Sequence, residues 1–74
     1  DPGQVRSFIP GKVSQLLVKS GDKVRKGDKM MIYEAMKMKN IITAPFDARI
    51  EEVFVEEGDK LPKGALLVKL VPIN

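Results

Sequence analysis

The stretch VKSGDKVRKG at residues 18–27 recurs as VEEGDKLPKG at residues 55–64, an offset of 37 residues at which six of ten positions are identical. The correspondence extends in both directions, because Val13 pairs with Ile50 and Met30 with Leu67 at the same offset. Each unit is half of a 74-residue chain, too short to bury an apolar face alone. The repeat therefore predicts two β units that interlock around a pseudo-twofold axis into one closed sandwich or flattened barrel.

The fold class follows from short apolar or alternating runs that are separated by turn residues, as is typical of strands. These runs are residues 13–18, 29–33, 40–43, 50–55 and 65–71. Glycine, proline and aspartate recur between them so often that no helix of ordinary length fits. We expect an all-β domain at residues 7–72, preceded by a linker remnant at residues 1–6.

Composition excludes several functions. The chain has neither cysteine nor histidine, so thiolate chemistry, sulfur-rich zinc sites and the commonest general base are absent. We therefore expect a domain without catalytic activity of its own. No apolar run approaches the 18 or so residues of a membrane span.

The formal charge of +3 hides two clusters, one basic and one acidic, that could steer docking to protein partners. A small basic β-barrel that binds nucleic acid is one alternative. The chain has only four aromatic residues, and none is interleaved with the basic residues, which argues against that alternative. The clusters are Lys23, Arg25, Lys26 and Lys29, and Glu51, Glu52, Glu56 and Glu57.

The two units meet in YEAMKMKN, residues 33–40. Two-fold symmetry places this junction in a hairpin between strands that end at about Tyr33 and begin at about Met38, far from the chain ends. Its tip falls near Met36-Lys37, although two-residue hairpins prefer Asn-Gly or Asp-Gly. A place where a sequence breaks a folding rule without local compensation is a candidate functional site.

Lys37 offers a primary amine on a long, flexible stem, and an amide formed on it is durable. Because the chain has ten lysines, including Lys39, reactivity alone cannot select one of them. The turn must present Lys37, and the flexible, polarizable side chains of Met36 and Met38 suit recognition by several proteins.

The pentapeptide EAMKM at residues 34–38 resembles the attachment motif of biotinyl carrier domains, the biotin carboxyl carrier modules of biotin-dependent enzymes. The similarity runs from about Ser7 to Val71. Further matching segments are IPGKV at 9–13, GDKV at 21–24, KGD at 26–28 and APFD at 44–47.

The resemblance implies two four-stranded antiparallel sheets, with biotin attached as an amide to Lys37 by a biotin protein ligase. Glu34, Ala35, Met36 and Met38 would form the recognition context. The arm would carry a carboxyl group between a biotin carboxylase and a carboxyltransferase or decarboxylase site. We further expect a monomeric domain in the cytoplasm, or in the mitochondrial matrix of a eukaryote.

Two alternatives share the fold. A lipoyl carrier domain places its lysine at the same turn, but typically between aspartate and alanine, so the flanking methionines favour biotin. An unmodified structural or adaptor module of the same fold generally lacks the lysine motif.

Overall fold

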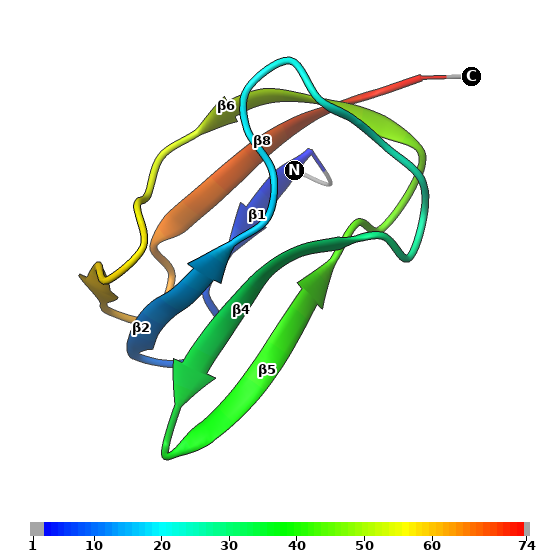
Figure 1. Ribbon diagram of the computed structural model, residues 1–74. Coiled ribbons are helices and arrows are strands. Elements are labelled where there is room, and N and C mark those ends of the chain that lie inside the picture. Colours follow the sequence, from blue (N-terminus) through cyan, green and yellow to red (C-terminus); the bar gives the residue numbers. More distant parts are fainter. Residues whose placement is uncertain (1–2, 74) are drawn as a thin grey trace.

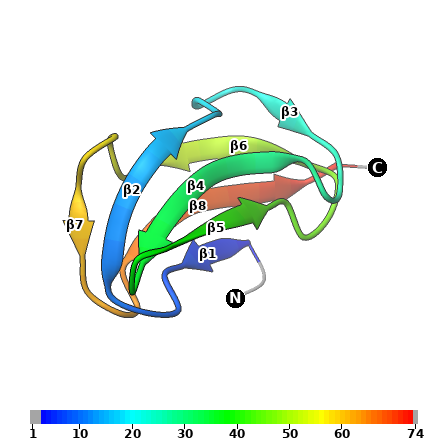
Figure 2. The same ribbon diagram turned by 60° about the horizontal axis from the view of Figure 1, so that its bottom comes forward.

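The computed structural model describes residues 3–73, which form two antiparallel four-stranded sheets (Figures 1 and 2). One sheet has the order β1 (Gln4–Arg6), β8 (Leu66–Pro72), β6 (Ala48–Val53) and β3 (Lys23–Val24). The other has the order β5 (Met38–Thr43), β4 (Lys29–Ala35), β2 (Gly11–Leu16) and β7 (Lys60–Leu61). The all-β class and the two four-stranded sheets are thus confirmed as a flattened sandwich. None of the described residues belongs to a helix that could cross a membrane.

The pseudo-twofold repeat governs the pairing of the strands. The order β1-β8-β6-β3 becomes β5-β4-β2-β7 when residue numbers are shifted by 37, and the registers follow the same shift. Hydrogen bonds then cross between the units in equivalent pairs. The Gly21 amide donates to the Ile50 carbonyl and the Gly58 amide to the Val13 carbonyl, both at 2.8 Å. The predicted interlocking of the two units is therefore confirmed.

The GD motif of the repeat builds its turns. In three turns the aspartate carboxylate accepts a hydrogen bond from the amide three residues earlier, at 2.9–3.0 Å. The preceding glycine has φ between 91° and 95°, where a side chain would be strained. The fourth turn begins with Pro62, which has no amide hydrogen to donate, and Ala65 stands where the others have aspartate. The three aspartates are Asp22, Asp28 and Asp59.

Three strands were not expected from the runs. Residues Gln4–Arg6 fall in the expected linker remnant but form β1, which pairs with β8. The two-residue strands β3 and β7 lie between turns. Each of the three contains a single apolar residue, so none shows the alternating pattern by which a strand is predicted. These strands are recognised only from their pairing with a neighbouring strand. Asp1 and Pro2 lie outside the described residues.

The core lies between the sheets and draws mainly on the interior strands. Burial of each large apolar side chain contributes about 1.5–3 kcal/mol relative to exposure. The fully buried large side chains are Tyr33, Met30, Met31, Ile50, Leu67, Val13 and Val68. Three of these seven, Met30, Met31 and Tyr33, lie on β4, so this strand is firmly anchored as it approaches the turn.

The β4–β5 turn lies at one end of the molecule, whose longest dimension is 36 Å (Figure 1). The symmetry-equivalent place is occupied by the end of β8 and the start of β1, which are joined by a hydrogen bond from the Leu70 amide to the Gly3 carbonyl (2.7 Å). A group attached at the turn therefore extends away from both ends of the described chain.

Candidate functional site

The turn between β4 and β5 consists of two residues, Met36 and Lys37. The strands stay paired up to Ala35 and Met38, so the turn is as short as an antiparallel hairpin allows. Its φ values are +52° at Met36 and +65° at Lys37, and no other non-glycine residue of the described chain has a positive φ. Two successive positive values are characteristic of a type I′ turn, in which residues other than Gly, Asn and Asp are disfavoured.

The side chains of the turn point into solvent. Met36 is 79% exposed and Met38 is 66% exposed, whereas Met30 and Met31 are fully buried. Lys37 lies between Met36 and Met38 in the sequence and is also exposed, and Ala35 is buried directly before the turn. The methionines of the turn therefore add little to the core and form an apolar, adaptable surface around the amine.

Glu34 lies between two lysines on neighbouring strands, opposite Lys12 of β2 and Lys39 of β5. In the described part of the chain the one ion pair within 4.0 Å joins Lys69 to Glu51 at 3.2 Å. Glu34 thus lies opposite two lysines in the sheet and forms no ion pair with either of them.

The base of the turn is held by contacts that the sequence patterns did not indicate. The Tyr33 hydroxyl donates to the Ile9 carbonyl at 2.7 Å, while its ring is fully buried. A β-carbon at Gly11 would stand 2.9 Å from the Tyr33 ring and closer still to the carbonyl oxygen of Glu34. Only glycine lets β2 approach β4 this closely, so the IPG segment fixes the strand that presents the turn.

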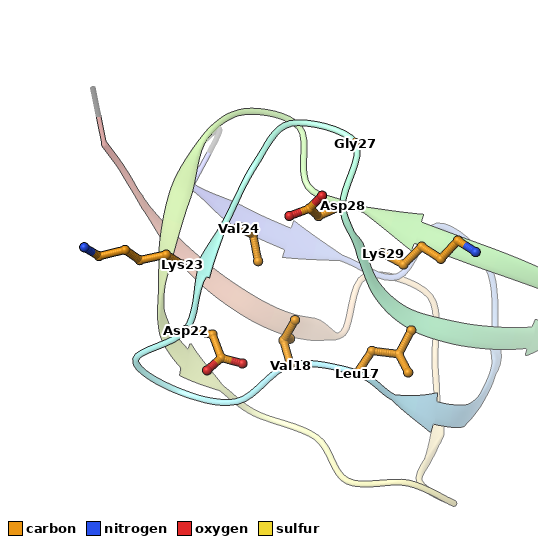
Figure 3. Close-up of a pocket in the computed structure, with 8 residues that line it drawn as sticks. All are labelled: Leu17, Val18, Asp22, Lys23, Val24, Gly27, Asp28 and Lys29. Carbon is orange, nitrogen blue, oxygen red and sulfur yellow. The ribbon is translucent and has the colours of Figure 1, made fainter.

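A hollow of about 520 Å³ at the other end of the molecule is formed by the loop at residues 17–29 (Figure 3). Its carboxylates are already used, because Asp22 and Asp28 each accept a backbone amide. Lys23 and Lys29 point in opposite directions (Figure 3), so they do not converge on one ligand. The hollow is therefore a consequence of how the turns form. Lys23 and Lys29, which belong to the basic cluster, do not form one patch.

The positive φ values predict that the turn stores conformational strain. Replacing Met36-Lys37 with Asn-Gly (Met36→Asn with Lys37→Gly) should stabilise the chain by about 1–2 kcal/mol, because both residues accept left-handed φ. Urea denaturation would measure the gain. Met36→Ala serves as the control, since alanine keeps the β-carbon and should give no such gain. Equal stability of the Asn-Gly variant and the wild type would show that the turn is unstrained.

Comparison with known proteins points to one family. Residues 3–70 match a biotin/lipoyl family model that is described as "Biotin-requiring enzyme". The chain is 40% identical over 70 residues to pyruvate carboxylase of Bacillus subtilis (strain 168), covering 95% of the chain and 6% of that protein. It is 44% identical over 61 residues to the mitochondrial methylcrotonoyl-CoA carboxylase subunit alpha of Mus musculus, covering 82% of the chain and 8% of the subunit. The chain thus spans less than a tenth of either relative.

Solved structures give the same fold from both branches of the family. A single-chain, multi-domain long-chain acyl-CoA carboxylase superposes with a TM-score of 0.86 at 26% identity, covering the whole chain and 8% of that protein. The lipoyl domain of the 2-oxoglutarate dehydrogenase complex from Azotobacter vinelandii superposes with a TM-score of 0.82 at 26% identity. That match covers 92% of the chain and 94% of the lipoyl domain. Backbone shape therefore does not discriminate between the two cofactors.

Proposed function

The chain belongs to the biotin/lipoyl attachment family, and we propose that it is the biotin carrier module of a biotin-dependent carboxylase or decarboxylase. The observation that carries this proposal is the position of Lys37. Its amine is exposed on a two-residue turn with left-handed backbone, between two exposed methionines, at one end of the long axis. Such a site fits a covalently attached cofactor, because the amine is open to an acylating enzyme on several sides.

In this proposal a biotin protein ligase joins the carboxyl group of biotin to Nζ of Lys37. The amide removes one positive charge from the turn. Met36 and Met38 provide the apolar contact surface for the ligase, and buried Ala35 anchors the end of β4 beneath them. Glu34 supplies the nearest carboxylate on that strand.

When bound, biotin supplies a ureido ring that accepts and donates a carboxyl group. The domain itself contributes presentation and reach, because the turn projects the arm away from the chain ends. Tethering to a biotin carboxylase and a carboxyltransferase would keep the arm at high effective concentration near both sites. Those partners select the substrate that accepts the carboxyl group. A location in the cytoplasm or the mitochondrial matrix stays a prediction from the resemblance.

A lipoyl carrier is the second candidate, because the Azotobacter lipoyl domain has the same fold. Identity to the pyruvate and methylcrotonoyl-CoA carboxylases, at 40% and 44%, favours biotin instead. The methionines on both sides of Lys37 favour the same choice, because a lipoyl lysine typically lies between aspartate and alanine.

Co-expression with a biotin protein ligase, and separately with a lipoate ligase and lipoate, tests the proposal by intact mass. We expect one biotin per chain, located by peptide mapping on the segment that contains Lys37, and no lipoyl adduct. A chain that stays unmodified by the biotin ligase, or that accepts lipoate instead, contradicts the proposal.

A further inference from the structure

The molecule carries two surface depressions that the pseudo-twofold axis relates to each other. One, of about 490 Å³, lies beside the β4–β5 turn, and its lining includes Lys12, Glu34, Lys37 and Lys60. The other, of about 350 Å³, lies near the end of β8, and its lining includes Lys23, Arg25, Asp28 and Asp47. At the offset of 37, Lys60 corresponds to Lys23, Leu61 to Val24 and Met36 to Ile73.

The two depressions differ in charge. The charged residues lining the depression near β8 are two cations and two carboxylates, so its formal charge is zero. The residues equivalent to Asp28 and Asp47 at the turn end are Ala65 and Pro10, neither of which is acidic. The depression beside the turn is consequently lined by three lysines and a single carboxylate. At the end that presents Lys37, the positions equivalent to both aspartates are therefore uncharged.

Two of these lysines face each other across a strand pair. Lys12 of β2 lies directly opposite Lys60 of β7. Like charges in this position destabilise an antiparallel pair. Glu34 lies opposite Lys12 on the other side, but neither lysine has a carboxylate within 4.0 Å in the described chain. An anion placed between Lys12 and Lys60 would relieve this repulsion.

Acylation of Lys37 would lower the formal charge of the depression beside the turn. Once that amine is an amide, two lysines and one carboxylate remain, which leaves a net charge of one positive unit. The strand β7 lies two strands away from β4, which is about 10 Å across the sheet. A lysine stem extended by the side chain of biotin is long enough to fold back over this distance.

We propose that Lys12 and Lys60 bind the carboxyl group that the biotin arm carries, so that the loaded arm rests against its own domain between two active sites. This inference rests on the proposed function. The uncharged arm has no such interaction, so the depression distinguishes a loaded arm from an empty one.

Amide chemical shifts of the isotopically labelled, biotinylated chain would test the inference. The arm is loaded with bicarbonate and ATP by a separate biotin carboxylase subunit, and spectra are recorded before and after loading. We expect loading to shift the amides of Gly11, Lys12, Lys60 and Leu61. The shifts should diminish as salt is raised from 0.1 M toward 1 M, where the Debye length falls from about 10 Å to about 3 Å.

A double variant, Lys12→Gln with Lys60→Gln, should lose most of the loading-dependent shift at Leu61, because it removes the two cations that hold the carboxyl group. The matched control is Lys23→Gln with Arg49→Gln, which removes the equivalent like-charged pair of β3 and β6 and should keep the full shift. Shifts confined to residues 36–38 in the wild type, or retained in the double variant, overturn the inference. A chain without a biotin adduct by intact mass overturns the proposed function instead.

Discussion

Replacing Lys37 with arginine should reduce biotinylation of the chain to background while leaving the fold unchanged. Arginine keeps the positive charge and much of the length of the side chain, but its guanidinium is not acylated by a biotinyl-adenylate. Because Lys37 is exposed on a turn, the exchange disturbs no packing. Intact mass after co-expression with the ligase measures the modification, and the urea midpoint measures the fold.

Lys39→Arg is the matched control, because Lys39 lies two residues away and is also exposed. It belongs to the extended strand β5 opposite Glu34, whereas Lys37 has a φ of +65°. We expect the control to be biotinylated as fully as the wild type. If the Lys37→Arg chain instead acquires biotin on Lys39, the ligase reads the local sequence rather than the turn, and the role assigned to the backbone geometry is wrong.

The repeat predicted most of the architecture, because an offset of 37 residues implies equivalent strands and equivalent registers. It also placed the turn at Met36-Lys37, since the junction of the two units has to lie opposite the chain ends. Residues 36 and 37 indeed connect β4 to β5. The prediction of a tip at Met36-Lys37 without the glycine that two-residue hairpins prefer is confirmed, and the φ values there are +52° and +65°.

Features that depend on register between distant strands were not predictable from the pattern. Nothing in a single run indicates that Lys60 lies opposite Lys12, because β7 is two residues long and its pairing is set by the neighbouring turns. The fit of Tyr33 against Gly11 has the same origin. A glycine after proline reads as an ordinary turn signal, and only the close approach of two strands reveals its second function.

Replacing Tyr33 with alanine should destabilise the chain by about 3–5 kcal/mol, the usual cost of removing a large buried aromatic side chain and leaving a cavity. Tyr33 is fully buried, its hydroxyl donates to the Ile9 carbonyl at 2.7 Å, and its ring lies 6.2 Å from that of Phe8. For a domain of 74 residues the total stability is about 4–11 kcal/mol, so this loss would leave little margin. Urea denaturation measures the change.

Two further variants separate the ring from the hydroxyl. Tyr33→Phe should cost about 0.5–1.5 kcal/mol, since it leaves the Ile9 carbonyl without its donor. Tyr33→Leu should fall between Phe and Ala, because Leu70 occupies the equivalent place in the other unit and is 3% exposed. Full biotinylation of folded Tyr33→Phe would show that the ligase requires the turn alone. Reduced biotinylation of a Tyr33→Phe chain that is still folded without urea would instead show that the hydrogen bond to Ile9 positions Lys37, which would make the base of the hairpin part of the recognition site.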